Sequence, residues 1–402
     1  MGLFAPFRPI VQDPTLALSA VLLVLFSTHL ASVLPYASSL AVTVFGLGDG
    51  SFSAVLVVAS LIAVTSSVGF GILADQRANR RGIALLSATS LTLGTALMVV
   101  APGPVTFVLV HVLLLPLASS IFGQIFALAR LAATLHPAAD RPAIQSTLRA
   151  LFALPWVMVL PVWALVFRSG AALTVIYPVC LVCAAALLGL TWWLWPRDGA
   201  TRWPDPRSGL SFRQSLREIW DPGVLLRVVS LGAINGGVTL YLVVIGLVFA
   251  ATPGRGAADT ALYAGITAGL EVPFMLALPL VLNRVPQARL ILIGAVLYAV
   301  HLAGIPLLAG SWTIWVLPWF AAIGGAVVLT QPMAYLQELL AARPGAGASL
   351  MALQKLVGDA FCAATFAVGV ALSGYGLAAV MGAVFAVTGA TALVLLDWRQ
   401  SR

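Results

Sequence analysis

Long runs of apolar residues, separated by short groups of Gly, Pro and charged residues, repeat along the whole chain. A run of about 20 apolar residues is long enough to cross the hydrocarbon core of a bilayer as a helix. The pattern therefore predicts an all-α membrane protein with twelve spanning helices, in two sets of six. We place them at 14–45, 51–74, 81–101, 104–134, 143–168, 170–195, 223–251, 258–283, 288–309, 312–342, 347–373 and 375–396.

The one long polar stretch of the pattern, residues 196–222, lies between the sixth and the seventh predicted helix. It predicts an N-terminal six-helix bundle over 1–195 and a C-terminal bundle over 223–402. Within the linker, apolar residues recur at helical spacing from Phe212 to Ile219, opposite arginines. This favours a short amphipathic helix on the cytoplasmic membrane surface, and the simpler alternative is a tether between the bundles.

Composition and charge agree with a membrane protein. The chain is 61% hydrophobic and 8% charged, whereas soluble domains carry about 25% charged residues. Most of the 21 Lys and Arg residues fall in loops on the side that holds both chain ends. The positive-inside rule then predicts a multi-pass protein of the bacterial inner membrane with both termini in the cytoplasm. The net charge of +8 is explained by contact with anionic lipid, so we expect no nucleic-acid partner.

Common enzyme and cofactor motifs are missing from the sequence. The stretch "GLGDG" at 46–50 lacks the lysine of a phosphate-binding loop. Cys180 and Cys183 lie inside an apolar run without a second pair, which favours structural cysteines over a metal or redox site. We expect no metal, no cofactor and no enzymatic activity.

Five polar residues fall near the middle of five different predicted helices. At about 1.5 Å per residue, each lies about 15 to 18 Å from the cytoplasmic end of its helix. Side chains of this kind cost several kcal/mol at such depth unless they are paired or face a wet cavity. They predict a central, water-filled cavity. The five are Gln124, Asn235, Glu271, Gln331 and Asp359.

The amides in this layer carry the paired donors and acceptors that sugar hydroxyls need, and nearby aromatic rings are candidates to stack on a sugar ring. The alternative for each amide is a plain hydrogen bond between helices, worth about 1 kcal/mol. The substrate-binding candidates are Gln124, Asn235, Gln331, Trp156, Tyr241 and Trp315.

The charged residues within the spans are candidates for proton coupling. Glu271 has no charged partner within four residues on its own helix, which favours a proton carrier. Lys355 and Asp359 are four residues apart on one helix face, so Asp359 either carries a proton or only neutralises the lysine. Arg149 stands at nearly the same depth in the fifth helix as Lys355 in the eleventh. That match indicates duplicated halves, which can rock against each other around a central site.

The loop after the second predicted helix carries a recognisable pattern. The stretch "GILADQRANRR" resembles the G-x-L-A-D-[RK]-x-G-[RK]-[RK] signature of the major facilitator superfamily, with departures at Gln76, Ala78 and Asn79. The stretches "QIFALAR" (124–130), "AGLEVP" (268–273) and "LQELLAARPGAGAS" (336–349) are most similar to the bacterial sugar efflux transporter family. The signature positions that match are Gly71, Leu73, Ala74, Asp75, Arg80 and Arg81.

The resemblance implies a monomeric exporter of sugars or related glycosides, driven by proton exchange through alternating access. We expect Gly71, Asp75, Arg80 and Arg81 to form a conformational switch, in which Asp75 meets the start of the eleventh helix and the arginines bind lipid phosphate or acids such as Glu338. The alternative is a charge cluster that only orients the helices. Two other functions stay open, an exporter of hydrophobic drugs and a receptor that binds a solute without moving it.

Overall fold

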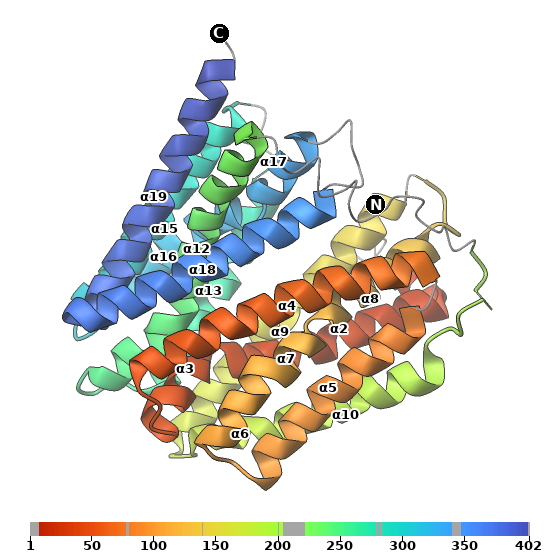
Figure 1. Ribbon diagram of the computed structural model, residues 1–402, viewed down its shortest axis with the longest axis horizontal. Coiled ribbons are helices and arrows are strands. Elements are labelled where there is room, and N and C mark those ends of the chain that lie inside the picture. Colours follow the sequence, from red (N-terminus) through yellow and green to blue (C-terminus); the bar gives the residue numbers. More distant parts are fainter. Residues whose placement is uncertain are drawn as a thin grey trace. The chain divides into compact units, whose positions relative to one another are not determined.

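The computed structural model describes residues 8–77, 80–138, 140–199, 201–203, 222–278, 281, 284–339 and 347–400, although the side chains at 72, 75–77, 337–339, 347–352 and 399–400 are left out. Within this part of the chain the structure is helical, without a strand, and twelve helices are long and apolar enough to cross a membrane (Figure 1). The spans begin and end close to the predicted residues, so the predicted fold class is confirmed.

The helices of the first half are α1 (Arg8–Gln12), α2 (Pro14–Val33), α3 (Ala37–Ser39), α4 (Asp49–Arg77), α5 (Arg80–Val100), α6 (Pro104–Leu109), α7 (Leu115–Ala118), α8 (Ser120–Ala133), α9 (Arg141–Arg168) and α10 (Ile176–Leu194). Those of the second half are α12 (Pro222–Ala251), α13 (Ala257–Ala277), α15 (Gln287–Leu308), α16 (Leu317–Val328), α17 (Gln331–Leu339), α18 (Gly347–Ser373) and α19 (Tyr375–Gln400).

The chain forms two compact units. The first comprises Met1–Val33, Thr65–Leu160 and Thr174–Gly209, and the second comprises Leu34–Val64, Pro161–Leu173 and Leu210–Arg402. Two segments from the first half of the chain therefore group with the second half. The division at the 196–222 linker stays a prediction, and most of that linker, including the proposed amphipathic helix, lies outside the described residues.

In the first unit, α10 packs against α5 and α2, and α2 packs against α8. The core holds fully buried aliphatic side chains such as Leu22 and Ile125. Buried polar groups in it bond across helices, as the His29 Nε2 atom does with the Thr95 Oγ1 atom at 3.0 Å. His29 therefore joins two helices by a hydrogen bond, which is the common role of a single histidine in an apolar helix.

In the second unit, α12 lies against both α18 and α19. The approach to α18 is close because glycines stand at the contact. A Cβ atom added to Gly236 would lie 2.9 Å from the carbonyl oxygen of Gly358. Small residues at such crossings let helix backbones approach, which provides the packing energy that holds membrane helices together.

Replacing Gly236 with Ala is therefore expected to destabilise the protein by about 1 to 3 kcal/mol, because the neighbour of the new methyl group is backbone, which cannot give way. A lowered melting temperature of the purified protein would show this effect. Gly123 on α8 provides the matched control, because a Cβ atom there meets nothing within 4 Å. If both variants melt alike, the close crossing does not limit stability.

The fourth and the tenth spans are each interrupted near a proline. In the fourth, a π-helical turn at Val110–Leu114 precedes α7, and Ser119 separates α7 from α8. In the tenth, α16 ends at Val328 and α17 begins at Gln331. Pro116 and Pro332 have no N–H to donate, so a backbone hydrogen bond of the helix is missing at each.

Hydroxyl groups bond the backbone around both interruptions. The Ser119 Oγ atom donates to the carbonyl of Pro116 at 2.6 Å, and the Thr330 Oγ1 atom donates to the carbonyl of Ala326 at 2.6 Å. Such hydroxyls make an interrupted helix tolerable inside a membrane.

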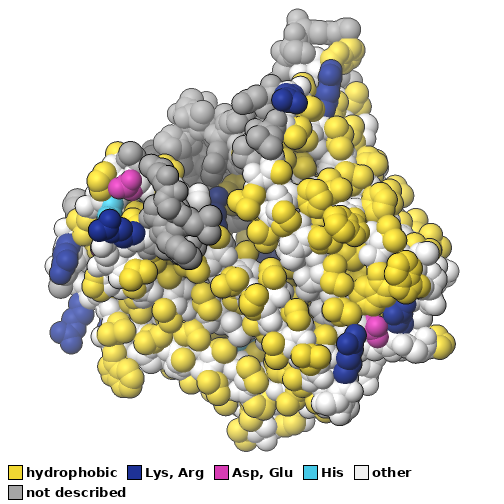
Figure 2. Space-filling view, turned by 180° about the vertical axis from the view of Figure 1, so that it is seen from behind, with side chains coloured by type: hydrophobic (Ala, Val, Ile, Leu, Met, Phe, Trp, Pro, Cys, Tyr) yellow, Lys and Arg dark blue, Asp and Glu magenta, His cyan; other side chains and the backbone are white. Residues whose placement is uncertain are grey.

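The outside of the molecule is apolar, as a lipid-facing surface must be. Large side chains such as Trp193 and Leu276 are more than three quarters exposed. Figure 2 shows hydrophobic side chains across a broad face, with Lys and Arg side chains near its margins. Together with the twelve spans, this surface makes the chain a multi-pass membrane protein.

Candidate functional site

The clearest charged pair within a span is that of Lys355 and Asp359 on α18. The Lys355 Nζ atom lies 2.6 Å from the Asp359 Oδ2 atom. The lysine side chain is 58% exposed, whereas that of Asp359 is 10% exposed. The helical spacing predicted this contact correctly.

Asp359 also has a partner on another helix. The Ser60 hydroxyl, on α4, donates a hydrogen bond to the Asp359 Oδ2 atom at 2.8 Å. Two donors thus converge on one carboxylate oxygen. The other, Oδ1, is buried without a hydrogen-bond partner in the described part of the chain. Such an asymmetric carboxylate has one oxygen free to take a proton or a ligand hydroxyl.

Asn235 of α12 lies against the backbone of α18. A Cβ atom at Gly358 would stand 2.6 Å from the Asn235 Nδ2 atom. Asn235 is half-buried. The structure thus places this amide at the residue before Asp359, and it adds Ser60 as a direct partner of Asp359.

Glu271 points into the packing of the second unit. Its carboxylate, on α13, fills the space that a Cβ atom of Gly325 would take on α16. Glu271 is thus packed against the backbone of α16 within its own unit.

Gln331 stands at the start of α17 and bonds to a neighbouring span. Its Oε1 atom accepts a hydrogen bond of 3.3 Å from Gln287, the first residue of α15. Its place in the mid-depth layer stays a prediction.

Two predicted stacking rings are packed against their own unit. Tyr241 is buried in a cluster with Tyr263 and His301, at ring distances of 6.2 and 4.8 Å. The guanidinium of Arg255 lies 5.5 Å from the ring centre of Trp315. Both rings thus have packing partners within the second unit.

The first unit holds the remaining candidates for solute binding and coupling. Gln124 on α8 is 4% exposed, and its Oε1 atom has no hydrogen-bond partner among the described residues. On α9, Arg149 is exposed and Trp156 is half-buried. Gln124 thus has a buried acceptor without a partner in the described part of the chain, and Trp156 is the more exposed of the two.

The predicted switch is described only in part. The Asp75 side chain and that of Glu338 lie outside the described residues, and Gly71 is an open position in α4. The backbone N–H groups of Arg80 and Arg81 both donate to the Asp198 Oδ1 atom, at 3.1 and 3.2 Å. The acid that caps the start of α5 is thus Asp198.

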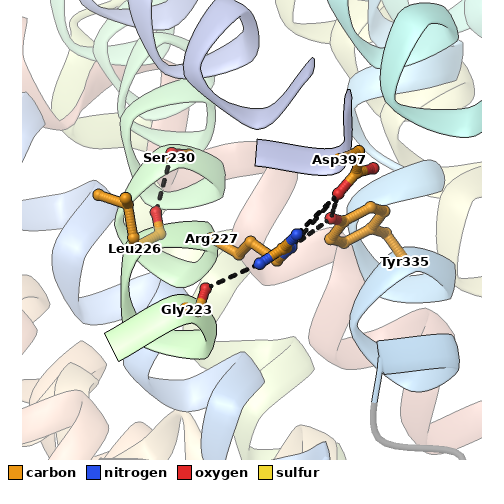
Figure 3. A network of polar contacts seen from close by, with 6 residues as sticks. All are labelled: Gly223, Leu226, Arg227, Ser230, Tyr335 and Asp397. Atoms are coloured by element: carbon orange, nitrogen blue, oxygen red, sulfur yellow. Dashed lines mark hydrogen bonds and ion pairs between the residues drawn. The ribbon is translucent and has the colours of Figure 1, made fainter. Parts of the chain in front are cut away.

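A second polar cluster, which the sequence did not reveal, joins three helices of the second unit (Figure 3). The side chain of Arg227 on α12 donates to the Tyr335 hydroxyl at 2.8 Å and to the Asp397 Oδ1 atom at 3.1 Å. Tyr335 also donates to Asp397 at 2.6 Å. Arg227 is 2% exposed. The sequence signal that could have pointed to this cluster is Asp397, an acid near the end of the last span.

Comparisons with known proteins found relatives by sequence and by structure. No family model matches the chain. A protein named as a sugar efflux transporter in Deinococcus radiodurans is 29% identical over 342 residues, which cover 85% of this chain and 86% of that protein. Sugar efflux transporter A of Dickeya chrysanthemi is 26% identical over 360 residues, which cover 86% of each.

Solved structures show the same fold. The nucleoside transporter NupG matches with a TM-score of 0.73 at 16% identity, over 96% of this chain and 99% of that one. A D-xylose-proton symporter matches with a TM-score of 0.72 at 18% identity, over 94% and 96%. These likenesses cover nearly the whole of each chain, so all twelve spans belong to one transporter fold.

Proposed function

We propose that this chain, a transporter of the major facilitator superfamily, exports sugars or related glycosides in exchange for protons by alternating access. The observation that carries the proposal is its similarity, over most of its length, to two proteins named as sugar efflux transporters. The distribution of basic residues supports a bacterial inner-membrane location with both termini in the cytoplasm.

Solute binding in this proposal uses polar and aromatic groups that are not already occupied. Gln124 has a carbonyl oxygen without a partner among the described residues, Asn235 is half-buried against the backbone of α18, and Trp156 is half-buried. A sugar needs donors and acceptors for its hydroxyls and a flat apolar ring for its C–H face. Gln331, Tyr241 and Trp315 are the further binding candidates of this proposal.

Proton coupling is assigned to the acids within the spans, Asp359 and Glu271, with Lys355 and Arg149 as the basic residues of the mechanism. An acid that is charged in one state and neutral in another changes the free energy of the two conformations by different amounts. The Asp75 loop with Arg80 and Arg81 is the conformational switch of this proposal.

The test is transport in proteoliposomes that contain the purified protein. With labelled lactose or glucose, we expect counterflow at equal pH on both sides and accumulation against a gradient when a pH difference is imposed. Liposomes without protein provide the background. Counterflow of a labelled lipophilic cation with no sugar counterflow would favour a drug exporter, and sugar binding without counterflow would favour a receptor. Either result contradicts the proposal.

A further inference from the structure

One face of α4 is tied to α18 and α19 at three places within the second unit. The Tyr375 hydroxyl of α19 donates to the Asp49 Oδ1 atom at 3.1 Å. The rings of Phe52 and Phe366 meet edge to face at 5.8 Å. The bond from Ser60 to Asp359 completes this α4 strip.

The bond from Ser60 to Asp359 differs from the bond from Tyr375 to Asp49 because its carboxylate is buried within a span. Asp359 is buried and Ser60 is 7% exposed, so water does not screen their bond. A hydrogen bond to an ionised carboxylate is about twice as strong as one between neutral groups. The Ser60 bond therefore holds α4 firmly only while Asp359 is charged.

A change in the charge of Asp359 affects the groups around it. On α18, Lys355 and Cys362 are the ionisable groups near it. From α12 the neutral Asn235 packs on the preceding residue, Gly358, and from α4 the hydroxyl of Ser60 bonds to Asp359. Among the described residues, Lys355 is thus its one ion-pair partner. Protonation of Asp359 leaves Lys355 without its countercharge.

We propose that Ser60 is a positioning residue that senses the charge of Asp359 and fastens α4 to α18 while the carboxylate is ionised. A proton that arrives from water binds the Oδ1 atom, since Oδ2 already accepts from Lys355 and Ser60. The bond of Ser60 then weakens, and the α4 strip is held to α18 and α19 only by its other two contacts. This inference rests on the proposed proton coupling, and it names Asp359 as the acid that sets the position of α4.

Two measurements on Ser60→Ala test the proposal. The first is the pH dependence of gradient-driven sugar uptake relative to counterflow. Loss of a donor to the charged carboxylate is expected to move the pH of half-maximal coupling upward by about one unit. The second is the labelling of a Val55→Cys probe by a membrane-impermeant maleimide, in a protein whose three native cysteines are replaced. Val55 is buried in α4, and labelling about tenfold faster is expected.

Matched variants separate this role from a general effect on folding. Ser60→Thr keeps the hydroxyl and should restore both readouts. Ser53→Ala removes a hydroxyl that bonds only within α4, to the carbonyl of Asp49, and should match the parent protein. A Ser60→Ala protein with the parent's pH profile and labelling rate overturns the proposal. Absence of sugar counterflow in the parent defeats the proposed function instead, while the labelling and its pH dependence still report on Ser60.

Discussion

An Asp359→Asn protein is expected to lose accumulation of sugar against a gradient entirely, while it continues to exchange labelled for unlabelled sugar. The amide imitates the protonated carboxyl but cannot release a proton, so the pH gradient no longer drives a cycle. Exchange does not require release of the proton and therefore continues. Uptake into proteoliposomes with and without a pH difference measures both.

Two further variants test whether the loss of accumulation is specific to Asp359. Asp140→Asn changes an exposed acid in the loop before α9 and should leave accumulation intact. Glu271→Gln compares the two candidate acids directly. If accumulation survives in Asp359→Asn and is lost in Glu271→Gln, the coupling role belongs to Glu271 and the role assigned to Asp359 is wrong.

An Asp397→Ala protein is expected to be less stable than an Arg227→Met protein. Removal of Asp397 leaves the guanidinium of Arg227, at 2% exposure, without its counterion. An uncompensated buried charge of this kind costs about 3 to 5 kcal/mol. Removal of Arg227 leaves a carboxylate that is 36% exposed and reaches water, so the expected cost is about 1 to 2 kcal/mol, that of the lost hydrogen bonds.

Melting temperatures of the purified variants give the order directly. Arg227→Met/Asp397→Ala, which removes both charges, should be more stable than Asp397→Ala alone, because no buried charge remains unpaired. Equal losses in the two single variants would mean that water reaches Arg227, in contradiction to its burial in the cluster of Figure 3.

The sequence was sufficient for the fold because length and hydropathy decide where a membrane helix lies. A span must cover the hydrocarbon core and hide its backbone, so its ends fall at the first polar or turn residues. The contact between Lys355 and Asp359 was likewise predictable, because residues four apart share a face of any helix. No tertiary information was needed for either.

The rest of the site depends on tertiary structure. A serine within an apolar helix, such as Ser60, is compatible with many roles, and only the folded chain shows that it faces Asp359. Only the folded chain shows that Gln287 of α15 bonds to Gln331. It alone shows that His301 packs on Tyr241 and Arg255 on Trp315.

The prolines in the fourth and tenth spans have a mechanical consequence. An uninterrupted helix resists bending along its whole length. A helix that lacks some backbone hydrogen bonds at one point bends there, as two rigid segments joined by a hinge. Around Ser119 and Thr330 the hydroxyls can change carbonyl partners as the segments tilt, so little hydrogen bonding is lost. Bending of either span would concentrate at these two hinges. The segments that move would then be α8 and α17, which carry Gln124 and Gln331.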